Sequence, residues 1–305
     1  IVSRLLYSDS TALSMSKLYL PLDVAGDVVL ITGATAGIGR ATAVRFAELG
    51  CKLILVGRRT QRLEELSAEL LTSFPESQEK LRPVLLTSDV SDASSLKDLP
   101  AKLEREHGVP AVDILVNNAG LALGVNSADT NELEDIKTMM ATNVIAVMTL
   151  VSAFAPGMKA RGKGHIINIS SVAGHEGYQG GSIYCGTKFA INGFTIAARH
   201  DFAGTPLRVT AISPGMVETE FSVVRMGDKD KADKIYDNIV PLCAEDVADQ
   251  VVYAATRPRR VQVADIISYP TNQGHAKYVV ERKGLEGLGP GGEDWRPTKR
   301  SKSAL

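Results

Sequence analysis

The stretch Val28-Val-Leu-Ile-Thr-Gly-Ala-Thr-Ala-Gly-Ile-Gly39 joins a short apolar run to a glycine-rich turn. Its β-branched half, Val28–Ile31, predicts a buried strand. The G-x-x-x-G-x-G spacing lets the backbone turn tightly and approach a phosphate, and the amino end of a following helix offers free N–H groups. Such a turn after the first strand of a βαβ unit predicts a site for a dinucleotide pyrophosphate. The turn residues expected at the phosphates are Gly33, Thr35, Ala36, Gly37, Ile38 and Gly39.

Outward from this turn, short apolar runs alternate with amphipathic stretches. The runs that predict strands are Val28–Ile31, Leu53–Val56, Arg82–Thr87, Asp113–Val116, Ile166–Ile169, Arg208–Ile212 and Asp265–Ser268. The stretches that predict helices include Ala41–Leu49, Arg62–Leu71, Leu96–Glu106 and Glu132–Phe154. Apolar strands that alternate with helices are typical of an α/β fold with a parallel sheet covered on both faces. No repeat or linker divides the chain, so we expect a single domain over residues 25–274.

Composition sets limits on the class of protein. The chain has 305 residues, of which 44% are hydrophobic and 23% charged, and its formal net charge is −1. This charge gives no support for nucleic-acid or membrane-surface partners. Three widely spaced cysteines (Cys51, Cys185 and Cys243) suit a reducing compartment, and neither they nor the histidines have metal-ligand spacing. We expect no metal, a cytoplasmic location, and no apolar run of the about 18 residues that a membrane span needs.

Three segments depart from the regular alternation. Residues 1–24 predict a flexible leader, for which organelle import and an extension ahead of Met15 are alternatives. The charged segment at about 216–240, centred on Phe221–Val240, predicts a mobile lid over a site. Residues 275–305 are rich in glycine and charge and predict a flexible C-terminal extension, with a basic localisation signal as the alternative.

The second predicted strand ends in Gly57-Arg58-Arg59, about 20 residues beyond the glycine turn, where an acid would bind the ribose of NAD. Arginines bind a phosphate bidentately, whereas an acid repels it. Arg58 and Arg59 therefore favour NADP(H). The alternative is that both are solvated residues at the start of the next helix, which would leave the cofactor undetermined.

Two further strand ends have open interpretations. Asp89-Val90 follows the third predicted strand, where the carboxylate could accept a hydrogen bond from an adenine amino group or cap a helix that begins near Ser91. Asn117-Asn-Ala-Gly120 follows the fourth, and its residues Asn117, Ala119 and Gly120 are either cofactor contacts or a structural turn.

Tyr184 and Lys188 are four residues apart and therefore share one face of a helix, with Ser171 upstream. A neighbouring ammonium lowers the pKa of a phenol and makes it useful as a general acid or base, and a serine hydroxyl can bind the same substrate oxygen. Taken alone, this spacing is also common by chance.

Several motifs now occur together and in order: Thr32-Gly-x-x-x-Gly-Ile-Gly39, Asn117-Asn-Ala-Gly120, Asn143, Ser171, Tyr184-x-x-x-Lys188 and Pro214-Gly215. Together they resemble the classical short-chain dehydrogenase/reductase family over about residues 25–272. The resemblance implies a Rossmann-like, doubly wound sheet of seven parallel strands and hydride transfer at a carbonyl or hydroxyl carbon. It also implies a homotetramer assembled through two long helices.

The resemblance assigns roles to individual residues. Tyr184 would be the acid/base, Ser171 would bind the substrate oxygen, and Lys188 would lower the tyrosine pKa and bind the nicotinamide ribose. Asn143 would hold a water that relays protons to Lys188. Residues expected beside the nicotinamide are Pro214, Gly215, Val217 and Thr219, and those expected at the adenosine side include Asp89 and Val90.

Sequence beyond Pro214 is similar to the NADP-dependent 3-hydroxy acid dehydrogenases, which act on serine, allo-threonine and related acids. The similar segments are Pro214–Arg225, Pro241–Asp249 and Tyr269–Gln273. Because such a substrate carries a carboxylate, the site needs a cation, and Arg225 in the predicted lid is our candidate. The alternatives are a surface arginine, a broad-specificity NADPH-dependent carbonyl reductase, and a non-catalytic NADP(H)-binding regulator.

Overall fold

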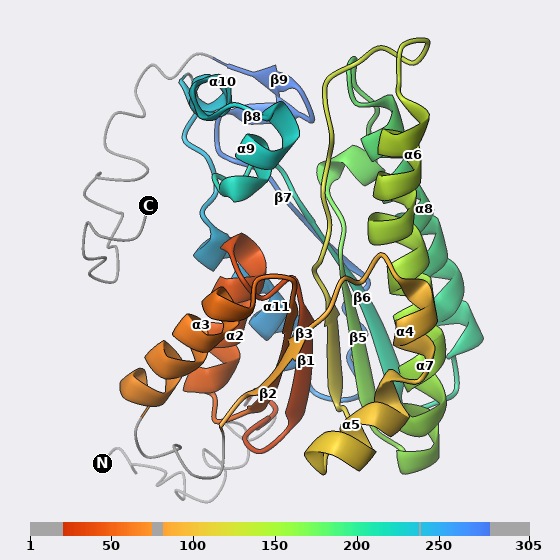
Figure 1. The fold of residues 1–305 in the computed structure, drawn as a ribbon. Coiled ribbons are helices and arrows are strands. Elements are labelled where there is room, and N and C mark those ends of the chain that lie inside the picture. The colour runs from red at the N-terminus through yellow and green to blue at the C-terminus, as the bar shows by residue number, and fades with distance from the viewer. Residues whose placement is uncertain (1–20, 75–81, 238, 281–305) are drawn as a thin grey trace, which may run out of the picture.

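The structure is a computed structural model that describes residues 21–74, 82–237 and 239–280 (Figure 1). In this part of the chain, seven strands form one parallel sheet in the order β3-β2-β1-β4-β5-β6-β7. They are β1 (Val28–Thr32), β2 (Lys52–Gly57), β3 (Val84–Thr87), β4 (Ile114–Asn117), β5 (Gly164–Ile169), β6 (Leu207–Pro214) and β7 (Asp265–Ser268). The predicted strands and the Rossmann-like doubly wound fold are confirmed.

The order of the strands reverses between β1 and β4. The chain builds outward from β1 through β2 to β3, then returns to place β4 on the other side of β1. In doubly wound sheets, ligands bind in the crevice at the carboxyl ends of the strands where this reversal occurs. The fold therefore places its ligand crevice where the loops after β1 and β4 meet.

Helices cover both faces of the sheet (Figure 1). One face carries α2 (Gly37–Glu48), α3 (Thr60–Ser73) and α11 (Ala244–Ala255), and the other carries α4 (Ala93–Lys97), α5 (Leu99–His107), α7 (Ala146–Arg161) and α8 (Ser182–Asp201). Phe46 and Val251 are buried on the first face, and Leu103 and Leu150 on the second. Because β1 and β4 lie between these two layers, their side chains are apolar on both sides, as the sequence predicts.

The helix predicted over Leu96–Glu106 is wrong in one respect, since it is two helices. α4 ends at Lys97 and α5 begins at Leu99, with Pro100 in its first turn. Proline has no N–H to donate and its ring obstructs the carbonyl four residues earlier, so it is tolerated only at the start of a helix. The break follows from Pro100.

The helix predicted over Glu132–Phe154 extends further along the chain, to Arg161. α6 (Leu133–Met140), a π-helical turn (Ala141–Ile145) and α7 run continuously over Leu133–Arg161. Their mean hydropathy reaches 1.7 in one window, which is enough by length and composition to cross a membrane, so the expectation that no stretch qualifies is wrong. Burial explains why this helix is so apolar. Of that window, 56% is buried inside the protein, and an apolar core helix passes the same test of length and composition.

The segment predicted as a lid contains α9 (Glu220–Met226) and α10 (Lys229–Asp233). Beside it lies a hairpin of β8 (Gln273–His275) and β9 (Tyr278–Val279) (Figure 1). The hairpin continues the ordered fold past residue 274, where we expected a flexible extension to begin. The rest of that extension, residues 281–305, and most of the predicted leader lie outside the described residues.

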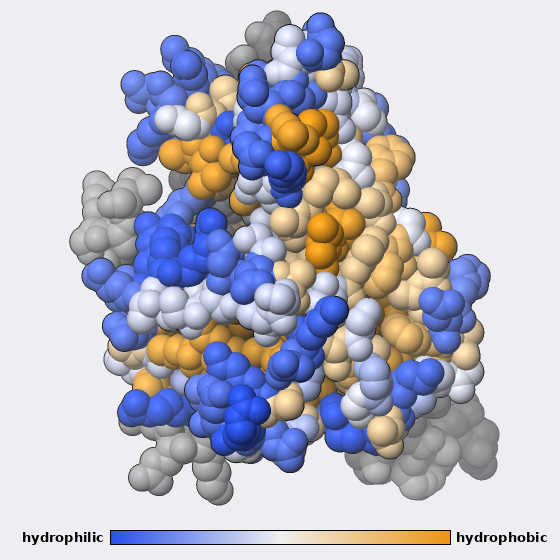
Figure 2. Space-filling model, turned by 45° about the vertical axis from the view of Figure 1, so that its right-hand side comes forward, coloured by the Kyte–Doolittle hydropathy of each residue, from blue (hydrophilic) through white to orange (hydrophobic). Residues whose placement is uncertain are grey.

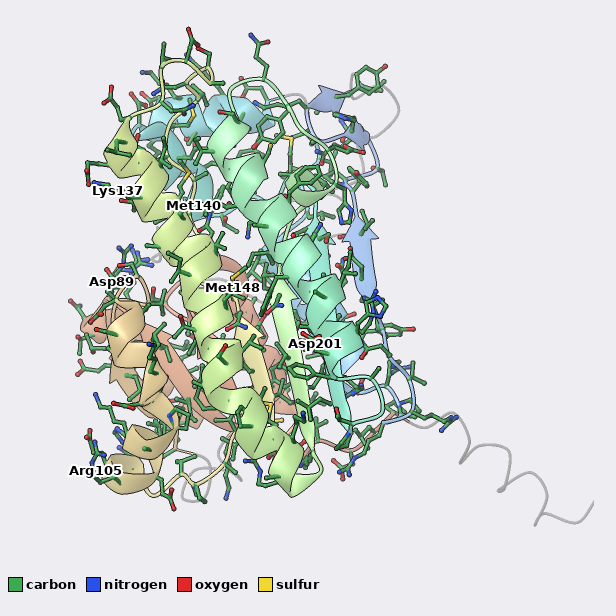
Figure 3. All side chains as sticks on the ribbon, turned by 90° about the vertical axis from the view of Figure 1, so that its right-hand side faces the viewer. Asp89, Arg105, Lys137, Met140, Met148 and Asp201 are labelled. Carbon is green, nitrogen blue, oxygen red and sulfur yellow. The ribbon has the colours of Figure 1, made fainter. Side chains whose placement is uncertain are left out.

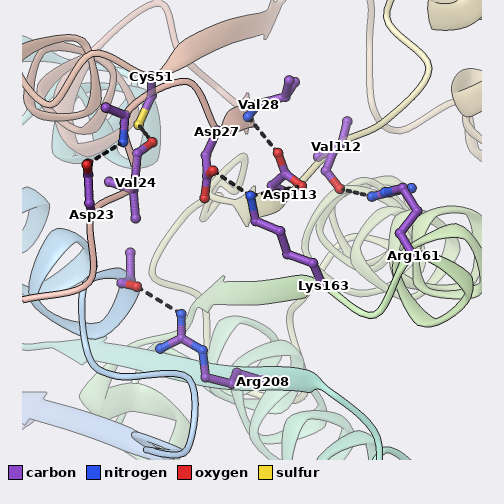
Figure 4. Close-up of polar contacts among 12 residues, drawn as sticks. Asp23, Val24, Asp27, Val28, Cys51, Val112, Asp113, Arg161, Lys163 and Arg208 are labelled. Carbon is purple, nitrogen blue, oxygen red and sulfur yellow. Dashed lines mark hydrogen bonds and ion pairs between the residues drawn. The ribbon is translucent and has the colours of Figure 1, made fainter.

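The amino ends of the strands carry a cluster of paired charges (Figure 4). Lys163, just before β5, pairs with Asp27 and lies 3.5 Å from Asp113, whose other oxygen accepts a hydrogen bond from Val28 N. A small pocket is lined in part by these residues, at the opposite edge of the sheet from the predicted catalytic residues. Since each of these charges has an opposite partner, the cluster fastens strand ends together.

Candidate active site

The structure brings the predicted catalytic residues together from separate elements. Ser171 follows β5 and opens a 3₁₀ turn (Val172–Gly174), while Tyr184 and Lys188 lie one turn apart on α8. The Ser171 hydroxyl accepts a hydrogen bond from Ala173 N at 3.1 Å and donates one to the Pro214 carbonyl at 3.3 Å. These contacts fix Ser171 beside the carboxyl end of β6.

The Tyr184 side chain is partly buried. Burial raises the pKa of Tyr184 above its ordinary value, and the charge of Tyr178 acts in the same direction. A hydrogen bond with Ser171 and the positive charge of Arg225 act in the opposite direction. The pKa of Tyr184 is therefore raised rather than lowered here, so this expectation is wrong for the structure as it stands, because desolvation of the phenol outweighs the nearby positive charges.

Lys188 is 7% exposed, and its ammonium lies 5.7 Å from the centroid of the Tyr184 ring. It donates a hydrogen bond to the Ile169 carbonyl at 2.9 Å. No carboxylate in the described part of the chain forms an ion pair with it. Burial lowers the pKa of Lys188 from its ordinary value of 10.5 to about 8. The lysine is thus an uncompensated buried cation beside the phenol.

Asn143 lies in the π-helical turn between α6 and α7, a local distortion frequent at functional sites. Its carboxamide accepts a hydrogen bond from Leu121 N at 2.9 Å and donates to the Leu121 carbonyl at 2.8 Å and to the Thr187 hydroxyl at 3.1 Å. A Cβ added to Gly120 would lie 3.4 Å from Asn143 Oδ1 and 3.7 Å from Lys188 Nζ. Asn143, Gly120 and Lys188 therefore meet at one point, while the proton-relay role of Asn143 stays a prediction.

The glycine turn fits a pyrophosphate. Gly33 and Gly37 have positive φ angles, and a Cβ at Gly39 would lie 2.4 Å from the Gly33 carbonyl oxygen, so only glycine permits this path. No side chain caps the amino end of α2, whose N-cap residue is Ala36. Its first N–H groups are consequently available to an anion, with the helix dipole in their favour.

Arg58 and Arg59 lie at the carboxyl end of β2, as predicted, and differ in their contacts. Arg59 donates to Thr35 Oγ1 at 2.8 Å and to Glu220, the first residue of α9, at 2.9 Å. Arg58 is largely exposed, and its nearest carboxylate, that of Asp89, lies 3.7 Å away. Arg62 pairs with the same Glu220. These arginines surround the edge of the crevice next to the glycine turn and are suited to a phosphate on the cofactor ribose.

The third strand ends as the sequence predicts, but the helix after it begins later. β3 ends at Thr87, so Asp89 follows the strand, and its carboxylate accepts a hydrogen bond from Ser91 N at 2.9 Å. The helix expected near Ser91 begins at Ala93 instead, capped by Asp92. Val90 packs in the core between the sheet and α4. Asp92 takes the capping role because its side chain can reach Ser94 N, two residues along.

The turn after β4 is partly scaffold. Asn117 donates to Asn168 Oδ1 at 2.8 Å, which joins β4 to β5. Asn118, which the sequence prediction did not single out, donates to the Thr32 carbonyl at 2.8 Å, and Thr32 Oγ1 accepts hydrogen bonds from Asn118 N and Ala119 N. These bonds hold the loops after β1 and β4 together at the point where the strand order reverses.

The loop after β6 contacts both the glycine turn and the hairpin. Thr219 caps α9, and a Cβ on Gly37 would lie 3.2 Å from the Thr219 side chain. A Cβ on Gly215 would lie 2.4 Å from Gln273 Oε1 in β8. Val217 pairs with Leu242 in an isolated bridge. The residues predicted beside the nicotinamide, which include Pro214 at the end of β6, thus lie at the carboxyl edge of the sheet.

Arg225 of α9 lies within the site. Its guanidinium carbon is 5.8 Å from the centroid of the Tyr184 ring, and the neighbouring Phe221 ring lies 5.6 Å from the same centroid. Arg225 is not a surface residue, because its nitrogens donate to the carbonyls of Gly124 and Gly180 and to the Tyr178 hydroxyl. The predicted lid packs directly against Tyr184.

Sequence reasoning missed Tyr178 and Lys277. The Lys277 ammonium lies 5.4 Å from the centroid of the Tyr178 ring, on the hairpin between β8 and β9. Tyr178 lies between the predicted catalytic residues Ser171 and Tyr184, whereas Lys277 lies in the predicted flexible extension. Neither residue belongs to a motif that sequence spacing alone would identify.

Comparison with known proteins agrees with this geometry. The model of the family described as short chain dehydrogenase matches residues 27–229. The NADP-dependent 3-hydroxy acid dehydrogenase of Schizosaccharomyces pombe is 42% identical over 85% of this chain and 98% of its own length. Serine 3-dehydrogenase of Rhizobium radiobacter is 41% identical over 84% of this chain and 98% of its own. The solved closed form of serine dehydrogenase complexed with NADP⁺ aligns with a TM-score of 0.76 at 41% identity, covering 84% of this chain and 100% of that one. The chain belongs to the short chain dehydrogenase family.

Proposed function

We propose that the chain is an NADP(H)-dependent oxidoreductase that interconverts a 3-hydroxy acid, such as serine or a relative, with its 3-oxo acid. The observation that carries the proposal is a cation, Arg225, held 5.8 Å from the ring of the proposed acid/base Tyr184. A carboxylate near the reacting carbinol would meet this charge. The names of the two similar dehydrogenases support the same substrate class.

The residues have separate tasks in this mechanism. The cofactor, when bound, supplies or accepts the hydride. Tyr184 gives its hydroxyl proton to the carbonyl oxygen during reduction, or accepts the carbinol proton during oxidation, and Ser171 donates a hydrogen bond to that oxygen. Lys188 keeps a positive charge close to the phenol, which favours loss of its proton. Arg58 and Arg59 would hold the 2′-phosphate, and the amino end of α2 the pyrophosphate.

Initial rates test the assignment. Oxidation of L-serine, L-allo-threonine, 3-hydroxyisobutyrate and 3-hydroxypropionate is measured with NADP⁺ and with NAD⁺, beside a neutral secondary alcohol. Turnover of the acids with NADP⁺ is expected. Turnover of the neutral alcohol alone would retain the reductase chemistry and refute the acid substrate class. In the same assay, Arg225→Ala should raise KM for the acids much more than for the neutral alcohol.

We further propose that the protein is a homotetramer assembled through the faces of α6, α7 and α8. Figure 2 shows an apolar area over these helices, and in Figure 3 Met140 of α6 and Met148 of α7 lie beside α8. Large apolar side chains exposed on these elements are Leu133, Met140, Ile145, Phe189 and Ile196. Contiguous exposed apolar surface of this kind is typical of subunit interfaces.

Light scattering during size-exclusion chromatography tests the assembly. Ile145→Lys places a charge in the proposed interface and should yield smaller species than the wild type. Val224→Lys, at an exposed apolar residue on α9 outside that face, is the matched control and should leave the mass unchanged. A wild type that elutes as a monomer would refute the tetramer.

A further inference from the structure

Two cationic side chains, those of Arg225 and Lys277, both lie close to the Tyr178 ring at the edge of the site. The Arg225 guanidinium carbon lies 5.5 Å from its centroid and the Lys277 ammonium lies 5.4 Å from it. Partial burial lowers the pKa of Lys277, and the charge of Arg225 acts in the same direction. Neither cation forms an ion pair with any acid in the described ranges. Two like charges held close together without an acid favour an anion beside them.

The two cations differ in how many of their N–H donors already have an acceptor. Arg225 donates from Nε to the Gly124 carbonyl at 3.2 Å, from Nη1 to the Tyr178 hydroxyl at 2.9 Å and from Nη2 to the Gly180 carbonyl at 3.1 Å. Each of its nitrogens has one acceptor, so among the described residues two of its five N–H groups remain without a partner. The Lys277 ammonium, by contrast, has no hydrogen-bond acceptor among residues 21–74, 82–237 and 239–280. Its N–H donors are available to a ligand.

The hairpin that carries Lys277 is fastened to the catalytic loop. Glu176, five residues after Ser171, accepts a hydrogen bond from Ala276 N at 2.8 Å, lies 3.3 Å from His275 Nε2 and accepts one from the Tyr269 hydroxyl at 3.1 Å. On the other side, Gln273 accepts from Met216 N at 2.8 Å. These bonds fix the backbone next to Lys277 relative to the loops after β5 and β6. The backbone at Lys277 is therefore fixed at the edge of the site, while its exposed side chain can reach a ligand there.

We propose that Lys277 binds the substrate carboxylate directly. Arg225 supplies the second positive charge, and its hydrogen bonds hold Tyr178 and the loops that contain Gly124 and Gly180 in place. The inference rests on the proposed function and names the residue that recognises the acid. It assigns a specificity role to the β8–β9 hairpin, which the family model, ending at residue 229, does not cover. The lysine would favour acids over neutral alcohols because an ammonium gains a charge-assisted hydrogen bond only from the former.

Steady-state kinetics with a charged substrate and its neutral isostere provide the test. Lys277→Gln is assayed on 3-hydroxypropionate and on 3-hydroxypropanamide, which shares the reacting carbinol and lacks the charge. Loss of a charge-assisted hydrogen bond should raise KM for the acid by about 10- to 100-fold and leave kcat and the amide KM within about twofold. Lys277→Arg, which keeps the charge, should recover most of the loss.

A binding measurement separates recognition from chemistry. Propionate, which has the carboxylate and no carbinol, should inhibit the wild type competitively, and Lys277→Gln should weaken that inhibition by the same factor. Lys231→Gln, at an exposed lysine on α10, removes an equal charge away from the site and should change neither value. If Lys277→Gln leaves the acid KM unchanged, or shifts the acid and amide KM values alike, the inference is wrong. If the wild type oxidises no acid at all, the proposed function itself fails.

Discussion

Two lysines at opposite edges of the same sheet have opposite surroundings. Lys163, at the amino ends of the strands, lies between the carboxylates of Asp27 and Asp113. Lys188, at the carboxyl ends, is 7% exposed and donates a hydrogen bond to a backbone carbonyl, that of Ile169. A charge placed between acids stabilises the fold, whereas a buried charge without an acid costs folding free energy. The comparison teaches that the carboxyl edge gives up stability to keep its charges available for a ligand.

The largest expected effect is on the catalytic rate and comes from Tyr184, at the carboxyl edge of the sheet. Tyr184→Phe removes the hydroxyl that transfers the proton, so we expect kcat to fall by about 10²- to 10⁴-fold. Quenching of protein fluorescence by NADPH should give an unchanged Kd, because the phenol ring and its packing against Phe221 remain. A variant with near wild-type turnover would mean that Tyr184 is not the acid/base. The carboxyl edge would then lose the catalytic role that sets it apart from the amino edge.

The next effect concerns the arginines of the crevice. Arg58→Ala and Arg59→Ala should each raise KM for NADP⁺ by about 10- to 100-fold, because each loses charge-assisted hydrogen bonds to the 2′-phosphate, and should leave KM for NAD⁺ nearly unchanged. Initial rates with both cofactors check this. Arg62→Ala is the matched control, since Arg62 shares Glu220 with Arg59. If Arg62→Ala has the same effect as Arg59→Ala, the arginines act by holding α9 and do not select the phosphate.

A smaller effect is expected at the amino edge. Lys163→Met leaves Asp27 and Asp113 facing each other without their cation, and should lower the free energy of unfolding by about 1–2 kcal/mol at pH 7, given that Lys163 is partly exposed. Urea unfolding measures it, with the exposed Lys229→Met as control. The kcat value should be unchanged. Burial raises the pKa of Asp27, so the deficit should shrink as the pH falls and that carboxylate takes up a proton. Loss of turnover with unchanged stability would reverse the assignment of the two edges.

The parts of the fold that local sequence encodes were predictable. Apolar runs identified the seven strands, and the spacings around Gly33, Tyr184 and Lys188 identified the site, because each pattern is contained in a few neighbouring residues. The split between α4 and α5 was also readable from Pro100, although the periodicity across it suggested a single helix.

Contacts between distant segments were not predictable from one sequence. The Arg59–Glu220 pair joins residues 161 positions apart, and the approach of Lys277 to Tyr178 depends on a hairpin fastened by Glu176. The pKa of Tyr184 was misjudged for the same reason, since helical spacing gives the distance to Lys188 but not the extent of burial that raises it. Such properties follow from the packed fold and not from a motif.

The unfolding free energy of Lys188→Met against pH tests the comparison most directly. Burial lowers the pKa of Lys188 from 10.5 to about 8 in the folded protein, so the charged lysine costs stability below pH 8, and this cost disappears as the pH rises toward 10.5. After allowance for the unpaired Ile169 carbonyl, a penalty that does not depend on pH, the variant should be about 1–2 kcal/mol more stable than the wild type at pH 7. This gain should reach zero between pH 8 and pH 10.5, and the variant should be slightly less stable at pH 10.5, although turnover is lost. A variant that is less stable at pH 7, as expected for Lys163→Met, would contradict the claim that the carboxyl edge is built for ligands at the expense of stability.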